Sequence, residues 1–302
     1  MLMGLLNKAT TVAMLSFVIS SMLAMGAGLT VAQIVAPLRN ARLVTLALLA
    51  NFVLMPLGAL ALTKGLWLDE PLGVGLLLLA CAAGAPFLPK LAELAKGNLP
   101  FAVGTMVLLM VITVVYLPLV LPLLLPGITV NPAKIAQSLV LVMLLPLGIG
   151  LIVKARYDEL AARSKPLLDW LSNISLILLI SLICVTNFDK VLQVFGTRGI
   201  LAALLFIAFG CVIGWLLGAP GNDTRRVLAL GTGQRNIAAA LVVASQSFSD
   251  PQVIVMVTVV AVIGLVTLMP LARALAKLGA TQRHDTGART SPTGKRRVHF
   301  SY

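Results

Sequence analysis

A short polar stretch, Gly231–Asn236, interrupts a long apolar run and places a charged side chain, Arg235, near its middle. The planar guanidinium of an arginine can hold a carboxylate with two parallel hydrogen bonds. Gln234 and Asn236 flank the arginine and add amide groups that can bond a polar ligand. These residue types at this spacing predict a binding site for an organic anion, formed by Arg235, Gln234 and Asn236.

A structural role for the same residues is the alternative. Arg235 would then pair with Glu93 or donate to backbone carbonyls freed where the helix is interrupted, and the flanking amides would satisfy the unwound backbone. Because a guanidinium stays protonated at physiological pH, Arg235 cannot itself carry protons. Proton coupling would need Glu93 or the substrate, so uniport or exchange follows more naturally.

A second set of candidates lies in residues 80–98, ACAAGAPFLPKLAELAKGN. Pro86 and Pro89 remove backbone donors, and Gly84 weakens the helix, so a continuous helix is not expected here. We predict that Pro86 and Lys90 contribute to the same anion site. For Lys90 the alternative is an ordinary basic residue at the cytoplasmic end of its segment.

Two further polar side chains lie in apolar segments. Asn51 is a lone polar residue and is included among the predicted substrate-binding residues, although hydrogen bonding between helices is the alternative explanation. Thr113 is expected to bond a carbonyl of its own helix.

The elements that must position these residues are membrane-spanning helices. The chain of 302 residues is 59% hydrophobic and 11% charged, with a mean hydropathy of +1.03, far more apolar than a soluble domain. Apolar runs of this length can cross the hydrocarbon core as helices. The sequence predicts an all-α polytopic membrane protein with nine such helices, at about 10–29, 41–63, 71–96, 99–125, 132–155, 166–187, 198–218, 224–248 and 251–275.

The third and eighth of these segments are the interrupted ones. Discontinuous helices in corresponding positions of two halves indicate the binding site of a transporter. If the first half lacks one helix, segments one to four and five to nine form two repeats in which both interruptions fall on the fourth member. The odd helix number then gives the two halves opposite orientations, which predicts an inverted repeat.

The net charge of +13 indicates membrane orientation and not a nucleic-acid partner. With the N-terminus outside, 17 of the 23 Lys and Arg residues lie in inside regions and five in outside regions, which leaves Arg235 in the membrane. Residues 1–278 are therefore expected to form the transmembrane domain. Residues 279–302 are expected to be a disordered, basic cytoplasmic tail, whose charges can also contact anionic membrane lipid.

Several kinds of chemistry are not expected. Both histidines, His284 and His299, lie in the tail, and no two acids are expected in facing membrane segments. The sequence therefore offers no catalytic base or acid pair for an intramembrane hydrolase. It also offers no metal-ligand spacing, and we predict no enzyme activity, cofactor or bound metal. A membrane receptor or scaffold that binds an anion without moving it stays an alternative, as does an arsenite-efflux type of transporter with Cys81 near its first break.

Four motifs in this order resemble the bile acid/sodium symporter family: MLAMGAGLT, LLANFVLMPLGA, ACAAGAPFLPKLAELAKGN and LALGTGQRNIAAALVVA. The resemblance covers nearly the whole hydrophobic part and fits the nine-helix kind of member. It implies a core domain, at about 41–125 and 198–275, in which the two broken helices cross. It further implies a panel domain, at about 10–29 and 132–187, an organic anion bound between the two domains, and transport by alternating access.

The sodium sites of the family are largely replaced in this chain. The resemblance places the family's sodium-binding glutamate on Leu230, and only Gln234 and a shortened amide at Asn51 remain as oxygen donors of the second site. The further sodium-site positions of the family fall on Leu88, Pro89, Ala102 and Met106. Sodium binding is therefore doubtful. The same comparison places Lys90 and Arg235 at positions that are neutral in the family, so Arg235 can stand in for bound sodium.

Together these features predict a secondary transporter for a small or amphipathic organic anion, independent of sodium. It is expected in a bacterial inner (plasma) membrane, with the N-terminus outside and the C-terminus cytoplasmic. A sodium-coupled symporter of bile-acid-like anions and a non-transporting receptor or scaffold are the alternatives.

Overall fold

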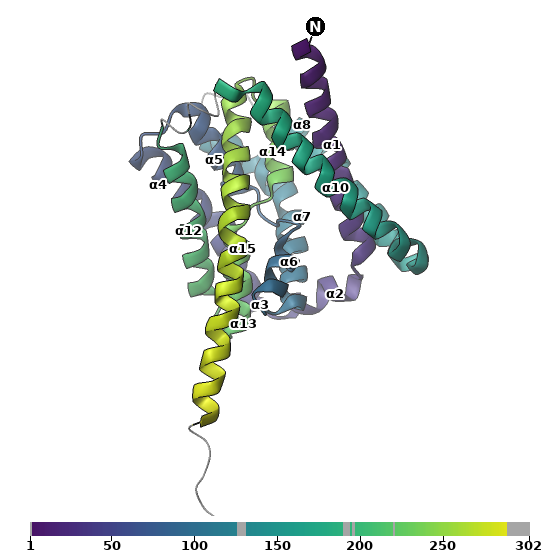
Figure 1. Cartoon of the computed structure of the whole chain (residues 1–302), viewed down its shortest axis with the longest axis vertical. Helices are drawn as coiled ribbons and strands as arrows, with labels where there is room; N and C mark the ends of the chain where they lie inside the picture. The colour runs from purple at the N-terminus through teal and green to yellow at the C-terminus, as the bar shows by residue number, and fades with distance from the viewer. Residues whose placement is uncertain (1, 126–130, 190–193, 195–196, 220, 289–302) are drawn as a thin grey trace, which may run out of the picture.

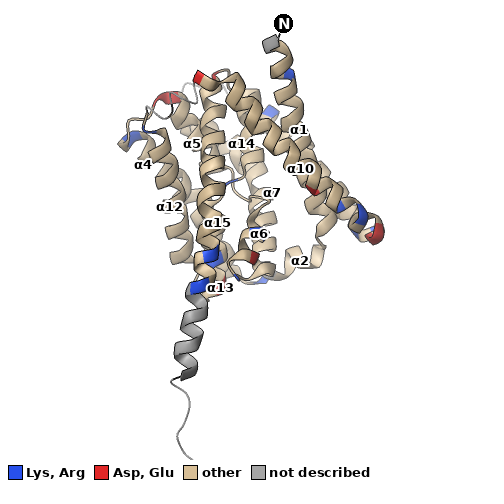
Figure 2. Cartoon of the chain, viewed as in Figure 1, with Lys and Arg blue, Asp and Glu red and all other residues tan. Residues whose placement is uncertain are grey.

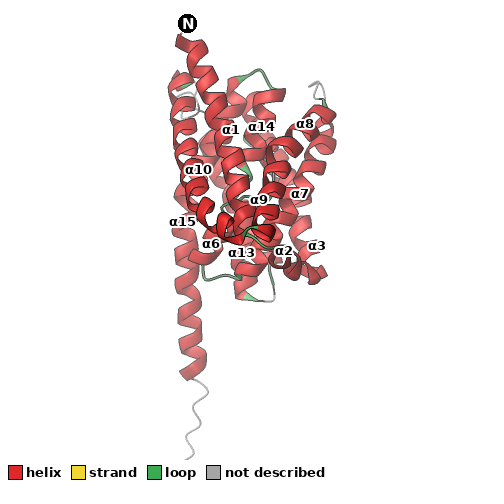
Figure 3. Ribbon diagram, turned by 90° about the vertical axis from the view of Figure 1, so that its right-hand side faces the viewer, coloured by secondary structure: helices red, strands yellow, loops and turns green. Residues whose placement is uncertain are grey.

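The computed structural model describes residues 2–125, 131–189, 194, 197–219 and 221–288, and these residues contain helices and their connections but no strand (Figures 1 and 3). Apolar side chains from most of the helices form one continuous buried core. The N-terminus lies at the upper end in Figure 1, and the last helix descends beyond the rest of the bundle at the lower end.

Eight stretches of helix in the described residues are long and apolar enough to cross a membrane, and the chain is a multi-pass membrane protein. Most of the expected segments correspond to single helices or to pairs that continue one another. The helices are α1 (Leu2–Gly28), α3 (Ala41–Leu49), α4 (Met55–Gly65), α7 (Leu99–Leu124), α8 (Pro132–Leu139), α9 (Leu145–Arg156), α10 (Asp158–Thr186), α12 (Gly199–Leu217), α13 (Asn222–Gly233), α14 (Ile237–Ser247) and α15 (Pro251–Ala288).

The expected third segment is not one helix but two short ones. These are α5 (Glu70–Cys81) and α6 (Leu88–Leu94), and neither alone is long enough to span the bilayer. Eight spans are therefore found directly, and the total of nine crossings, like the inverted repeat, stays a prediction.

Two helix boundaries differ from the expected ones. The segment expected at 166–187 begins at Asp158, because charged side chains at its start continue the helix through ion pairs one turn apart, including Lys165 with Asp169 at 2.6 Å. At the other end of the chain, the backbone of α15 continues to Ala288. The rest of the expected tail, 289–302, lies outside the described residues.

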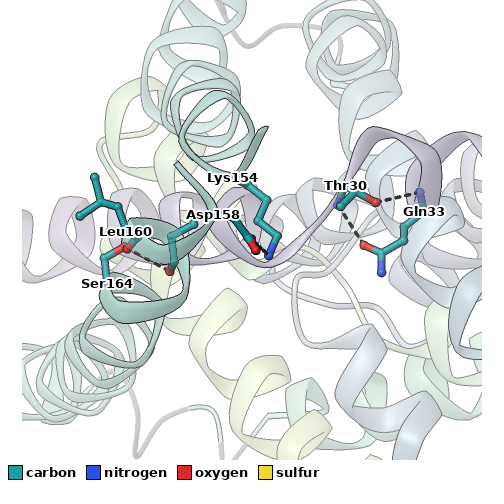
Figure 4. A network of polar contacts seen from close by, with 7 residues as sticks. Thr30, Gln33, Lys154, Asp158, Leu160 and Ser164 are labelled. Carbon is teal, nitrogen blue, oxygen red and sulfur yellow. Dashed lines mark hydrogen bonds and ion pairs between the residues drawn. The ribbon is translucent and has the colours of Figure 1, made fainter. Parts of the chain in front are cut away.

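Two connections at the lower end are shaped by local polar contacts (Figure 4). Thr30 and Gln33 form a reciprocal capping box that starts α2 (Val31–Val35), which leads through η1 (Ala36–Arg39) into α3. Lys154 pairs with Asp158 across the turn between α9 and α10. The capping box supplies hydrogen-bond partners to the backbone at the start of α2, and the ion pair stabilises the turn between α9 and α10. Both connections are therefore short and sharply turned.

Helices α1, α9 and α10 contact one another, and α12 contacts both α13 and α15. In Figure 1, α1 and α10 lie on the right and α12 on the left. The α1–α9 crossing is tight because both helices use glycine there. A Cβ on Gly150 would lie 2.6 Å from the carbonyl oxygen of Leu23 on α1. Lys and Arg residues lie at the lower ends of α13 and α15 and at the lower tip of α10 (Figure 2).

Candidate functional site

The two expected helix breaks are present, and both lie inside the protein. The helix α5 ends at Cys81 and α6 begins at Leu88, while α13 ends at Gly233 and α14 begins at Ile237. Residues 82–85 and 234–236 between them are buried. This confirms the expectation that unwound backbone at membrane depth must be enclosed by protein or line a watery space.

Gly84 permits the turn in the first break. Its φ of +79° lies in the left-handed region that other residues avoid. There is also no room for a side chain, because a Cβ would overlap the backbone nitrogen of Met110 and lie 2.6 Å from the carbonyl oxygen of Met106. Pro89, by contrast, occupies the first turn of α6, where its missing N–H costs nothing.

Asn236 joins the two breaks and is fully buried. Its backbone N–H donates to the carbonyl of Ala82 at 2.9 Å, and its side-chain Nδ2 donates to the carbonyl of Gly84 at 3.0 Å. Its Oδ1 accepts the N–H of Ala239 and thereby caps the start of α14. The side chain of Asn236 therefore holds the crossing together, in agreement with the structural alternative for this residue.

Arg235 lies beside the crossing with only 3% of its surface exposed. Its Nε donates to the carbonyl of Leu79 at 2.9 Å, and its Nη2 donates to the carbonyl of Ala80 at 2.5 Å. Its Nη1 donates to Oδ1 of Asn51 at 2.7 Å. Two longer contacts reach the carbonyls of Thr232, at 3.4 Å, and Asn51, at 3.5 Å. All five N–H groups of the guanidinium are thus directed at protein oxygens.

These oxygens include no carboxylate. In the described part of the chain no Asp or Glu pairs with Arg235, and Glu93, the expected structural partner, pairs instead with Lys90 at 2.9 Å. The carbonyls of Leu79 and Ala80 are available because α5 ends immediately after them. Arg235 therefore carries a buried positive charge that is solvated by neutral oxygen atoms only.

Asn51 is brought to Arg235 by an irregular turn. The chain between α3 and α4 forms one turn of π-helix, η2 (Ala50–Leu54), just before Pro56. Proline has no N–H, so the carbonyls of Asn51 and Phe52 lack their usual helical donors. Arg235 bonds the first of these carbonyls, and the hydroxyl of Tyr116 bonds the second at 2.5 Å. Asn51 therefore forms hydrogen bonds between helices, in agreement with the alternative explanation for this residue.

Gln234 is the polar residue at the crossing whose side chain is not satisfied. It is 8% exposed, and its Oε1 is buried without a hydrogen-bond partner among the described residues. Gln234 and Arg235 line a cavity of about 20 Å³, whose remaining wall comes mainly from apolar residues of α5, α6, α12 and α15, including Phe87 and Leu268. This volume is enough for one water-sized group.

Four of the six predicted site residues do not line this cavity, namely Asn51 and Asn236, which form hydrogen bonds at the crossing, and Lys90 and Pro86. The side chain of Lys90 is 57% exposed and forms its ion pair with Glu93 on the same face of α6, which agrees with the surface alternative for Lys90. Pro86 lies in the turn before α6, and its neighbour Phe87 lines the cavity in its place.

Thr113 performs a role that its sequence context does not reveal. From the sequence, its hydroxyl is expected to bond a carbonyl of its own helix. Instead, the hydroxyl accepts a hydrogen bond from the N–H of Ala83 at 3.0 Å and donates to the carbonyl of the same residue at 3.1 Å. The unwound stretch after α5 is therefore held to α7 by one hydroxyl. This contact depends on the packing of α7 against the break and cannot be predicted from the sequence around Thr113.

Replacing Thr113 with valine should destabilise the protein by about 2 to 4 kcal/mol, because both backbone groups of Ala83 lose their partner in a buried place. Denaturation of the purified protein in detergent measures this. Thr258→Val is the matched control, since Thr258 is also buried but bonds only the carbonyl of Ile254 in its own helix. Equal losses of stability in the two variants would show that the hydrogen bonds between Thr113 and Ala83 do not stabilise the first break.

Comparison with known proteins identifies the protein class. A profile of the sodium bile acid symporter family matches residues 15–194, more than half of the chain. The chain belongs to the sodium bile acid symporter family. The family consists of transporters and not of enzymes, and the resemblance read from the four motifs is confirmed.

Relatives with curated names support the same class. The "Probable sodium/metabolite cotransporter BASS2, chloroplastic" of Oryza sativa subsp. japonica is 27% identical over 248 residues, 78% of this chain and 57% of that protein. The "Uncharacterized sodium-dependent transporter YocS" of Bacillus subtilis (strain 168) is 27% identical over 213 residues, 68% of this chain and 65% of that protein. The matches thus span well under two thirds of the former's length and about two thirds of the latter's.

Proposed function

We propose that this family member is a secondary transporter that moves a small or amphipathic organic anion by alternating access and does not need sodium. The observation that carries the proposal is the environment of Arg235. Its guanidinium is buried at the crossing of the two broken helices among five oxygen acceptors, none of them charged. Oxygen atoms of this kind are the ligands that hard cations such as sodium prefer. In this proposal the guanidinium of Arg235 takes the place of a bound sodium ion and is covalently attached to the chain.

The buried charge favours an anionic substrate. An unpaired arginine at membrane depth costs at least about 2.5 to 3.5 kcal/mol on insertion scales, and a carboxylate nearby would recover part of that cost. The three short hydrogen bonds fix the guanidinium, whereas the contacts to Thr232 and Asn51 at 3.4 and 3.5 Å are weak. A carboxylate can therefore be attracted by the charge or can exchange with one of these weak contacts.

Gln234 supplies the polar contact that is still free. Its unpartnered Oε1 can accept a hydrogen bond from a polar group of the substrate, beside a small cavity with mainly apolar walls. In this proposal Arg235, Gln234, Asn51 and Asn236 form the site, while Lys90 and Pro86 lie outside it.

The core and panel domains are part of the proposal. The broken helices belong to the core, and α1, α8, α9 and α10 to the panel. The cavity beside Gln234 and Arg235 is lined by residues of the core, so the substrate would bind to the core. The lower end in Figure 2, where Lys and Arg residues lie on α13 and α15, would face the cytoplasm of a bacterial cell.

Sodium coupling is the second candidate, and one observation favours it. The unpartnered Oε1 of Gln234 is an oxygen donor in a cavity large enough for one small ion or one water. The names of both relatives described above also refer to sodium. In that case Arg235 would have a structural role only.

A thermal-shift screen separates the two candidates. Purified protein is heated with a panel of organic carboxylates in sodium buffer and in choline buffer, because a ligand stabilises the state it binds. We expect at least one acid to stabilise equally in both buffers, and Gln234→Leu to reduce that shift while the protein without ligand melts normally. Stabilisation seen only in sodium would support coupling. Absence of any shift with any acid would contradict the anion site.

A further inference from the structure

The irregular helix turn beside Asn51 has a counterpart elsewhere in the chain. A second turn of π-helix, η3 (Val140–Leu144), joins α8 to α9 and lies 90 residues after η2. Five of ten positions are identical between 49–58, LANFVLMPLG, and 139–148, LVLVMLLPLG. The two helices run in opposite directions, since α3 to α4 ascends in Figure 1 and α8 to α9 descends in Figure 3.

Both turns have the same backbone pattern. In η2 the N–H of Met55 bonds the carbonyl of Ala50, and in η3 the N–H of Leu145 bonds the carbonyl of Val140, each five residues back. A proline follows at Pro56 and at Pro146, so the ladder of hydrogen bonds is interrupted at the same place. Such π turns and prolines are where helices bend.

The two turns differ in what holds them. In η2 the carbonyls of Asn51 and Phe52 are bonded by Arg235 and by Tyr116, and the three residues Ala50–Phe52 are buried. The equivalent carbonyls in η3 belong to Leu141 and Val142. Neither accepts a hydrogen bond from a side chain in the residues that the structure describes, and the side chain of Leu141 is 51% exposed. The turn η3 packs against α1 through apolar contacts that include the buried Met143, so the two turns differ in the side-chain hydrogen bonds to their free carbonyls.

The helices on either side of η3 are attached to different partners. Below the turn, α9 is held against α1 by the contact of Gly150 with the backbone of Leu23. Above it, α8 contacts α7 and also α14, the second half of a broken helix, where Ser138 forms a hydrogen bond with Gln246. A bend at η3 would therefore move α8 and its contact with α14 while α9 stays in place.

We propose that η3 with Pro146 is a hinge at which α8 tilts relative to α9, so that the Ser138–Gln246 contact between α8 and α14 can open and close. In the transport cycle, opening and closing of this contact would gate the upper end of the molecule. This role in transport rests on the proposed function. The hinge itself is tested without any substrate, so its failure and that of the proposed function are distinguishable.

The bend can be measured as the distance between two spin labels on the protein in lipid nanodiscs. Labels replace the exposed Lys134 and Ile152, on either side of η3, in a chain with Cys184→Ala and Cys211→Ala. The matched pair replaces the exposed Thr45 and Ala61 around η2. The two pairs lie about 27 and 24 Å apart along straight helices, within the range of pulsed dipolar spectroscopy.

We expect the η3 pair to give a distance distribution at least about twice as wide as that of the η2 pair. Pro146→Ala restores an N–H and should narrow the η3 distribution to the η2 width, whereas Gln246→Leu should widen it further. Pro56→Ala should leave the η3 distribution unchanged. Equal widths for the two pairs in the otherwise unchanged chain would overturn the proposal, whether or not Pro146→Ala folds. So would a wide η3 distribution that a folded Pro146→Ala protein retains.

Discussion

If Arg235 replaces bound sodium as proposed, its replacement with alanine is expected to make the stability and the transport activity of the protein depend on sodium. The substitution leaves the carbonyls of Leu79 and Ala80 and the amide oxygen of Asn51 without a donor. Each such group costs about 1 to 3 kcal/mol, part of which is offset because a buried charge is removed. We expect a net loss of about 3 kcal/mol in choline buffer and a fall in transport of about 100-fold, equivalent to about 2.7 kcal/mol.

Sodium should reverse part of this loss. The vacated oxygens form a donor set that suits a hard cation, and sodium at about 100 times its dissociation constant would restore about 2.7 kcal/mol. Melting curves of both proteins in sodium and in choline measure the effect. The protein with Arg235 should melt at the same temperature in both buffers, and only the variant should gain stability from sodium.

Arg226→Ala is the matched control for this experiment. Arg226 is also a buried arginine, 8% exposed, and its Nη1 donates to the carbonyls of Ala95 and Lys96 at 3.1 and 3.2 Å. It lies away from the crossing, so its loss should lower stability in the same way in both buffers. A sodium response in the unsubstituted protein, or its absence in Arg235→Ala, would show that Arg235 does not replace an ion.

Substituting Gly84 with alanine should have the largest effect on folding. The backbone conformation at φ +79° costs an alanine about 1 to 2 kcal/mol. The added Cβ would overlap the backbone of Met110 on α7, which cannot rotate away as a side chain could. Because the carbonyl of Gly84 also accepts a hydrogen bond from Asn236, any shift would disturb the crossing. We expect a total loss above about 3 kcal/mol.

Size-exclusion chromatography in mild detergent after graded heating measures this loss. Gly148→Ala is the control, since Gly148 lies in α9 and a Cβ added there would meet no neighbouring atom within 4 Å. That substitution should be neutral or slightly stabilising, because alanine favours a helix over glycine by about 1 kcal/mol. Similar behaviour of the two variants would mean that the first break does not require a left-handed glycine.

The sequence by itself was sufficient for the membrane class, the apolar segments and the places where two of them break. Long apolar runs report on span length directly, and Pro86, Pro89 and Gly84 weaken a helix through their own covalent structure. The polar residues Gln234 to Asn236 likewise mark the second break without reference to any neighbour. These are local properties, and the family resemblance rests on the same stretches.

Only the tertiary structure decided which groups these residues meet. The main acceptors of Arg235 are 155 to 184 residues away in the chain, Thr113 bonds a break 30 residues earlier, and Lys90 turns away to Glu93. Such contacts depend on how helices are rotated and shifted against one another. No periodicity in the chain encodes that register, because lipid-facing and buried positions of these helices are both apolar.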